Sequence, residues 1–351
     1  MTAVWDYPDF DAHEAVHVFE DSASGLRAII AVHSTHLGPA AGGTRFWHYA
    51  DNAAAVTDAL RLSRGMSYKN ALAGLPLGGG KGVILAPADK QKTPELLAAF
   101  GRAIEQLGGR YVTAEDVGMR DADMVAISAE TAHVAGLPVS DPAKAGGDPG
   151  PYTARGVYLG IKAAARFRLG SQNMSDVHVA IQGVGSVGGG VARLLAGDGA
   201  KLTIADFDGD KARSIAAETG ADVAALGDIM SIKADIFSPN ALGAILTPDS
   251  IAALNVAIVA GGANNQMAGN GDEKRLFDRG ILYAPDYVIN AAGIINVGLE
   301  YLGDYTVGDV NSRIDIIPAR LTEIWEESAA EKLPAATIAD RMAQRLIGRA
   351  A

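Results

Sequence analysis

The chain has 351 residues, of which 48% are hydrophobic and 20% charged, a composition typical of a globular protein with a large buried core and two domains. Thirty basic and 41 acidic residues give a formal net charge of −11, so the chain lacks the positive field that nucleic-acid binding requires. The absence of cysteine excludes disulfides, thiolate metal sites and a cysteine nucleophile.

The N-terminal segment carries acids where a signal peptide would carry a basic and then an apolar region, so we expect a cytoplasmic protein. The uncharged stretch 250–271 contains several asparagines and glycines, which a bilayer would not accept. We therefore expect no membrane association, and no bound metal.

The first half of the chain alternates strand and helix patterns. The apolar run 26–32 predicts a strand, and 52–71 predicts a long helix with one apolar face. A capping threonine and a first-turn proline at 93–94 open another helix, which ends at Gly108. A strand follows at 111–113, so this half is α/β without a nucleotide-binding fingerprint.

A segment rich in proline and glycine at 140–151 forbids a regular element, and we expect the domain boundary and a hinge there. Beyond it, a helix at 153–166 precedes an apolar strand at 177–182. The C-terminal residues 311–351 carry two helical patterns separated at Pro334.

The strand at 177–182 leads directly into the glycine pattern Gly183-Val-Gly185-Ser-Val-Gly188, which is followed by a helix near 191–195 and a strand at 201–205. In such a unit the first glycine permits a tight turn, the second lets a pyrophosphate approach the backbone, and the third lets helix and strand pack closely. An acidic residue, Asp206, ends the second strand. The pattern in this context predicts a dinucleotide site.

Asp206 is expected to accept hydrogen bonds from the adenosine ribose and, with Asp208, to repel a 2′-phosphate, which favours NAD over NADP. The alternative is a solvated acid at a strand end. Apolar runs at 234–237, 256–260 and 281–283 continue a parallel sheet, and polar clusters follow at the carboxyl ends of two of them, where ligands bind in such sheets.

Two lysines of the first half do not lie within a run of charged, solvent-exposed residues. Lys69 falls near the end of the long helix, and Lys81 is bracketed by Gly78–Gly80 and Gly82. A lysine in apolar surroundings loses hydration, so its pKa should fall and it could serve as a base or as a fixed cation. We read the four glycines as a place where backbone approaches a ligand. The alternative for either lysine is a side chain that reaches solvent.

An acid after the strand at 111–113 is well placed for proton transfer, although either Glu115 or Asp116 could equally cap a helix. The glycine-rich turn 38–45 could offer backbone groups to a small polar ligand or be purely structural.

Taken together, these segments resemble the amino acid dehydrogenases of the glutamate/leucine/phenylalanine/valine family, over about residues 26–298. The matching stretches occur in the family's order and spacing: GPAAGGTR, RGMSYKNALAGLPLGGGKGVI, GGRYVTAEDVG, DPGPYTARGVY, IQGVGSVG, SPNALGAIL, VAGGANNQ and LYAPDYVINAAGIINV. The resemblance implies NAD-dependent, reversible oxidative deamination of an L-amino acid to a 2-oxo acid and ammonium, by a homo-oligomer.

The resemblance also implies an architecture. It consists of an N-terminal α/β substrate and oligomerisation domain, residues 1–145, joined by a C-terminal helix at 332–351. A doubly wound Rossmann domain that binds NAD spans 146–331, and a cleft lies between the two.

Catalytic and binding roles follow residue by residue. The lysine matching Lys69 holds the substrate α-carboxylate, the one matching Lys81 activates water, and the aspartate matching Asp116 handles protons of the amine. The full set of implied substrate contacts is Lys69, Ala41, Gly42, Gly43, Ala114, Asn264, Ile294 and Val297. The implied cofactor contacts are Gly183, Gly185, Ser186, Val187, Gly188, Asp206, Thr153, Asn240, Ala241, Ala260, Asn264 and Asn290.

Ala41 departs from the glutamate-specific members, which place a lysine there for the side-chain carboxylate. An alanine cannot bind that group, so the resemblance implies a neutral substrate, either branched-chain or aromatic, with phenylalanine-like substrates slightly ahead. Two other readings are an NAD-dependent 2-hydroxy acid dehydrogenase and a non-catalytic NAD-sensing protein.

Overall fold

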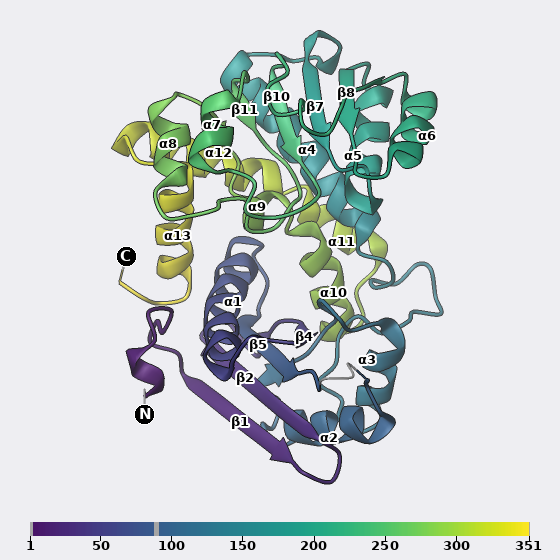
Figure 1. The fold of residues 1–351 in the computed structure, drawn as a ribbon, viewed down its shortest axis with the longest axis vertical. Helices are drawn as coiled ribbons and strands as arrows, with labels where there is room; N and C mark the ends of the chain where they lie inside the picture. Colours follow the sequence, from purple (N-terminus) through teal and green to yellow (C-terminus); the bar gives the residue numbers. More distant parts are fainter. Residues whose placement is uncertain (1–2, 88–90, 351) are drawn as a thin grey trace. The chain divides into compact units, whose positions relative to one another are not determined.

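The computed structural model describes residues 3–87 and 91–350, and the chain forms two compact units (Figure 1). The first contains residues up to Gly147, Ile294–Val310 and the residues from Ala343 onward. The second contains Asp148–Gly293 and Asn311–Met342. The chain therefore leaves the first unit inside the segment rich in proline and glycine.

Two segments are assigned differently from the predicted division. Residues 294–310 belong to the first unit, because the Asn296 amide donates to the Gly146 carbonyl and Glu300 accepts from the Gly136 amide. Residues 332–342 belong to the second unit, where the Tyr287 hydroxyl donates to Asp340. Only the end of the predicted C-terminal helix thus joins the first unit.

The sheet of the first unit has the order β1-β2-β5-β3-β6, and β4 also pairs with β5. The pairs β1–β2 and β2–β5 are antiparallel, whereas β3 and β4 pair with β5 in parallel, as do β3 and β6. The strands are β1 (Ala15–Asp21), β2 (Leu26–Ser34), β3 (Ala40–Ala41), β4 (Thr44–Trp47), β5 (Gly78–Leu85) and β6 (Tyr111–Val112).

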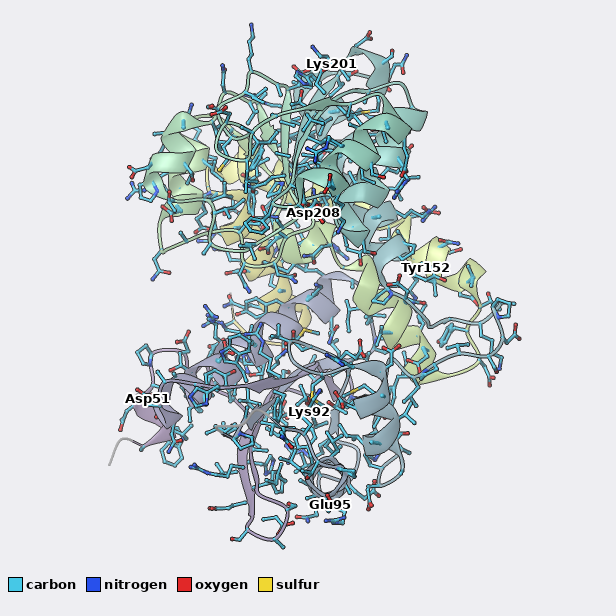
Figure 2. The ribbon with its side chains drawn as sticks, turned by 45° about the vertical axis from the view of Figure 1, so that its right-hand side comes forward. Asp51, Lys92, Glu95, Tyr152, Lys201 and Asp208 are labelled. Carbon is cyan, nitrogen blue, oxygen red and sulfur yellow. The ribbon has the colours of Figure 1, made fainter. Side chains whose placement is uncertain are left out.

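Helices α1 (Asn52–Leu72) and α2 (Pro94–Glu105) cover opposite faces of this sheet. Alternation along β2 sends Ile30 into the cluster that holds Phe100 of α2, and Ala31 into the cluster that holds Ala59 of α1. Both helix starts are capped as their sequences indicate: Asp51 and Thr93 side chains accept from backbone amides of the first turn. Figure 2 labels Asp51, and Lys92 and Glu95 near the start of α2.

The sheet of the second unit is parallel throughout, with the order β12-β11-β10-β7-β8-β9. Helices α4 and α5 pack together against it, and the cluster of Phe237 and Val259 packs against α7 and α8. This confirms the predicted doubly wound architecture. The strands are β7 (His178–Gln182), β8 (Lys201–Ala205), β9 (Asp222–Val223), β10 (Ile236–Pro239), β11 (Ile258–Val259) and β12 (Leu282–Tyr283).

The remaining elements are short or connect these layers. The α-helices not yet given are α3 (Asp121–Ser128), α4 (Gly150–Leu169), α5 (Ser186–Gly197), α6 (Gly209–Thr219), α7 (Pro248–Ala253), α8 (Asp272–Asp278), α9 (Asp286–Ile289), α10 (Ala292–Leu302), α11 (Val307–Ile314), α12 (Ile317–Glu331) and α13 (Ala335–Leu346), and the 3-10 helices are η1 (Val4–Asp6) and η2 (Met174–Asp176). Within residues 3–87 and 91–350, none of the helices has the length and apolar character to cross a bilayer.

Candidate functional site

Lys81 lies on β5, a central strand of the first unit, and its side chain is buried. The run Gly78–Gly80 that precedes it is itself part of the strand, although glycine is normally depleted in strand interiors. This strand was not predicted, because the composition of the segment indicates a loop.

The glycines around Lys81 make room for protein atoms, which corrects our expectation that they admit a ligand. A Cβ on Gly79 would lie 2.0 Å from the backbone nitrogen of Ser67 on α1, and one on Gly82 would lie 2.1 Å from the Thr44 hydroxyl. The glycines therefore let β5 pack against α1 and the neighbouring strands. Lys81 is the one residue of this run that carries a side chain into the site.

Lys81 belongs to a connected cluster of charged side chains. The Lys81 ammonium donates to Asp116 Oδ2, which also accepts from Arg45 Nε at 2.9 Å. Arg45 in turn donates through its terminal nitrogen to Asp58 Oδ2 at 2.9 Å, and the Tyr49 hydroxyl donates to the same oxygen at 2.7 Å. Cations and carboxylates thus alternate from Lys81 to Asp58, and the exposed Arg61 also donates to Asp58 Oδ1, at 3.3 Å.

Burial and these charges set the protonation of the cluster. Burial lowers the pKa of the Lys81 ammonium, the predicted direction, while Asp116 opposes this shift and Arg45 adds to it. Burial alone would raise the pKa of the Asp116 carboxyl, but Lys81 and Arg45 outweigh it and lower the pKa to about 2. Asp116 is therefore an anion, and Lys81 is an ammonium that loses its proton more readily than a solvated lysine.

Three side chains that contact one another here had no role predicted from the sequence: Arg45, Tyr49 and Asp58. Arg45 lies on β4, and it reaches Asp116 because Thr44 of that strand forms a β-bridge with Glu115. Its only signal in the sequence was an arginine at the end of a glycine-rich turn. Of the two acids, Asp116 accepts a hydrogen bond from Lys81, whereas Glu115 is exposed.

The substrate residues predicted on the turn before β4 lie close to this cluster. A Cβ on Gly43 would lie 3.0 Å from the Asp116 Cβ, and one on Gly42 would lie 1.8 Å from the Gly80 carbonyl. Lys69 is half-buried in the last turn of α1. The turn is thus fixed against both β5 and Asp116.

The four predicted side-chain contacts Ala41, Ala114, Ile294 and Val297 line one cavity of the first unit. Its volume is about 10 Å³, room for roughly one water molecule. The other lining residues are Gly42, Leu77, Val112, Thr113, Ala135, Gly298 and Tyr301. No lysine or arginine lines this cavity within the described part of the chain, so its wall offers no cation to a side-chain carboxylate.

In the second unit, the glycine pattern forms the turn between β7 and α5. Gly183 has φ of +83°, which favours glycine, and a Cβ on Gly188 would lie 1.9 Å from the Gly183 carbonyl. Beside Gly185, by contrast, an added Cβ would have one neighbour within 4 Å among the described residues, apart from adjacent residues of the chain: the Lys211 ammonium at 3.9 Å. The open space at Gly185, before a helix N-terminus formed by Ser186 and Val187, fits a pyrophosphate.

Asp206 directly follows β8, whose first residue, Lys201, is labelled in Figure 2. Its Oδ2 accepts from the Val184 amide at 2.7 Å and its Oδ1 from the Asp208 amide at 2.9 Å. Asp206 therefore ties the glycine turn to the strand end, in addition to any contact with a ribose. Asp208 caps α6 through its own carboxylate.

Four of the remaining predicted cofactor residues follow the carboxyl ends of β10 and β11: Asn240, Ala241, Ala260 and Asn264. The Gly262 amide donates to Asn240, and the Asn290 amide nitrogen donates to Asn264. Ala241 lies against Gly183, whereas Ala260 is fully buried. The Thr153 hydroxyl donates to the Pro149 carbonyl within the first turn of α4.

Among the residues that the structure describes, no group of three or more histidine, aspartate or glutamate side chains could hold a metal ion.

Comparisons with known proteins agree with this geometry. Residues 13–133 match the family model described as Glu/Leu/Phe/Val dehydrogenase, dimerisation domain, and residues 203–348 match that of Glutamate/Leucine/Phenylalanine/Valine dehydrogenase.

Individual relatives match over almost the whole chain. A leucine dehydrogenase of Thermoactinomyces intermedius is 44% identical over 98% of this chain and 93% of its own, and a valine dehydrogenase of Streptomyces coelicolor is 44% identical over 98% and 94%. The crystal structure of L-tryptophan dehydrogenase from Nostoc punctiforme superposes with a TM-score of 0.87 at 40% identity, covering 96% of each chain.

Proposed function

Because this chain belongs to the glutamate/leucine/phenylalanine/valine dehydrogenase family, we propose that it catalyses the reversible, NAD-dependent oxidative deamination of a neutral L-amino acid. The observation that carries the proposal is the buried Lys81–Asp116 pair in the same unit as a cavity with an entirely uncharged wall. The pair provides groups for proton transfer, and the uncharged cavity wall determines which class of substrate side chain can bind.

The overall reaction converts an L-amino acid, NAD⁺ and water into a 2-oxo acid, ammonium, NADH and one proton. A bound NAD⁺ would supply the acceptor for the hydride of Cα. Water then adds to the carbon of the resulting substrate iminium, and the C–N bond breaks to release ammonium.

The protein's own groups handle the protons and the charges. Lys81, with its lowered pKa, takes a proton from the attacking water and, as an ammonium, stabilises the oxygen of the adduct. Asp116 exchanges protons with the substrate amine, and Lys69 binds the α-carboxylate. These roles rest on the family resemblance together with the burial of Lys81.

We place branched-chain substrates ahead of aromatic ones, which reverses the slight preference drawn from Ala41 alone. The cavity of about 10 Å³ has to open before any side chain enters, and a leucine or valine side chain needs a smaller displacement than an aromatic ring. The leucine and valine dehydrogenases among the relatives support the same order.

The enzymes of this family depend on NAD or NADP, and we propose NAD here. The open space at Gly185 fits the pyrophosphate, held by Gly183–Gly188. The carboxylates of Asp206 and Asp208 would repel a 2′-phosphate. A homo-oligomeric state is also proposed, supported by the match to a dimerisation domain and checked by light scattering.

Initial rates of NADH or NADPH formation from leucine, valine, phenylalanine, tryptophan and glutamate test the proposal. We expect leucine or valine to give the highest kcat/KM, and NAD to exceed NADP. A clear preference for glutamate would refute the argument from Ala41. Reduction of 2-oxo acids without any need for ammonium would favour the 2-hydroxy acid dehydrogenase instead.

A further inference from the structure

The loop after β11, residues 261–265, is held by three side-chain amides whose hydrogen-bond directions can be followed from atom to atom. Gln266 donates to the Gly261 carbonyl at 2.8 Å and to the Ala263 carbonyl at 3.0 Å. Asn240 accepts from the Gly262 amide at 2.8 Å and donates to the Ser238 carbonyl at 3.0 Å. The backbone on either side of Asn264 is therefore fixed.

Asn290 is the third of these amides, and its orientation is determined by a backbone carbonyl. Its Nδ2 donates to the Gly262 carbonyl at 3.1 Å and to Asn264 Oδ1 at 2.7 Å. A carbonyl can only accept, so a reversed Asn290 would set two acceptors against each other. Asn290 is 4% exposed, and its Oδ1 has no hydrogen-bond partner within the described residues.

The orientation of Asn290 fixes that of Asn264. Since Asn264 accepts from Asn290 through Oδ1, its Nδ2 group must point the other way. Asn264 is exposed, and no hydrogen bond of its Nδ2 occurs in residues 3–87 and 91–350. The loop thus presents an NH₂ donor, backed by a buried side chain that prevents the amide from turning over.

We propose that Asn290 is a positioning residue, which acts through Asn264 by holding it as a hydrogen-bond donor toward an acceptor atom of the ligand. The acceptor is an oxygen, either of the amino acid carboxylate or of the nicotinamide carboxamide. The inference rests on the proposed function and deepens it, because it assigns the direction of a contact and gives Asn290 an indirect role.

A double-mutant cycle tests whether Asn290 acts through Asn264. Kd values for NADH, and for a 2-oxo acid in the presence of NADH, are measured by fluorescence for Asn264→Ala, Asn290→Ser and the double variant. We expect Asn264→Ala to lose affinity roughly tenfold or more and Asn290→Ser to lose less. The double variant should bind no more weakly than Asn264→Ala alone. Additive losses would overturn the proposal.

The two equilibria also distinguish the two acceptors. A loss already seen with NADH alone identifies the carboxamide oxygen, whereas a loss confined to the 2-oxo acid identifies the carboxylate. Either result supports the proposal, and unchanged affinity of Asn264→Ala for both ligands would overturn it.

Asn296→Ser is a matched control in the first unit. Asn296 is also a fully buried asparagine that donates to a backbone carbonyl, that of Gly146 at 3.0 Å. We expect any loss of ligand affinity caused by Asn296→Ser to add to the loss caused by Asn264→Ala. Coupling as strong as that of Asn290 would mean that the cycle reports general loosening, and the proposal would fail.

Side-chain amide hydrogen exchange in the free protein, followed by NMR, keeps the inference testable without ligand or activity. We expect the Nδ2 protons of Asn290 to exchange slowly and those of Asn264 to exchange quickly. Slow exchange at Asn264 would show the opposite polarity and overturn the proposal. If the wild-type chain bound no NADH and oxidised no amino acid, the proposed function would fail while this measurement still decided the orientation.

Discussion

The two units hold their candidate site residues by different means. In the first unit, Lys81 and Asp116 are held by charge, with Arg45 and Asp58 completing the cluster. In the second unit, the glycine turn and the loop at 261–265 are held by close backbone contacts and by neutral amides. The contrast matches the work proposed for each, since proton transfer needs tuned charges and ligand positioning needs fixed directions.

This difference predicts different responses to substitution. Changes in the charge cluster should alter how activity and stability depend on pH, because they move the pKa values of its members. Changes in the turn and the amide loop should alter folding or affinity by similar amounts at every pH where the asparagines stay neutral. The following substitutions test that separation.

The largest effect is expected at the glycine turn. An alanine at 188 would place its Cβ 1.9 Å from the Gly183 carbonyl, so Gly188→Ala should lower the free energy of unfolding by about 3 kcal/mol. The matched variant Gly185→Ala meets no close atom and has φ of −66°, so it should fold normally but bind NADH more weakly. Equal stability of both variants in urea unfolding would contradict the packing argument.

The next effect concerns acid stability. The pKa of Asp116 falls from 3.8 to about 2 on folding, a shift equivalent to roughly 2 kcal/mol. The folded pKa is depressed, so this stabilisation is present above pH 3.8 and is lost as the pH falls toward 2. Urea unfolding at several pH values measures this effect. Over this pH range, the free energy of unfolding of Asp116→Asn should fall less steeply than that of the wild type. A decline as steep as that of the wild type would argue against the ion pairs.

Arg45 should set where activity begins on the pH scale. Arg45 contributes to lowering the pKa of Lys81, so Arg45→Gln should raise that pKa and move the acidic limb of kcat/KM to higher pH, by about one unit. Arg45→Lys keeps the charge and should leave the limb nearly in place while kcat falls. An unshifted limb in Arg45→Gln would remove Arg45 from the proton chemistry.

The smallest effect is expected at the start of α2, away from both sites. Thr93→Ala removes the hydroxyl that accepts from the Leu96 amide, which should cost about 1 kcal/mol of stability. Thermal unfolding measures this loss, and kcat should not change. A large fall in kcat would show that a change at the start of α2 affects activity as well as stability.

The same contrast explains what the sequence allowed us to predict. The second unit follows a local pattern, in which strand, glycine turn, helix and Asp206 succeed one another within some thirty residues, so its fold and its glycine roles could be predicted. The assignment of 294–310 to the first unit could not, because it depends on contacts such as that of Asn296 with Gly146, 150 residues apart.

The charge cluster was only partly accessible from the sequence. Lys81 stood out because of its unusual neighbours, but β5 was hidden by its glycines, and Arg45 meets Asp116 across 71 residues of sequence. Neither hydrophobic periodicity nor a sequence motif predicts that contact. The family resemblance supplied Asp116 but gave no role to Arg45, Tyr49 or Asp58.

The most direct test of the account is the rate of leucine-dependent NADH formation by Lys81→Met, compared with the wild type at the same pH. Methionine fills the buried space without an ammonium, so the variant should remain folded by thermal unfolding. We predict that kcat falls at least about a hundredfold, as expected for loss of a general base. A folded variant that kept wild-type turnover would contradict the central role of Lys81.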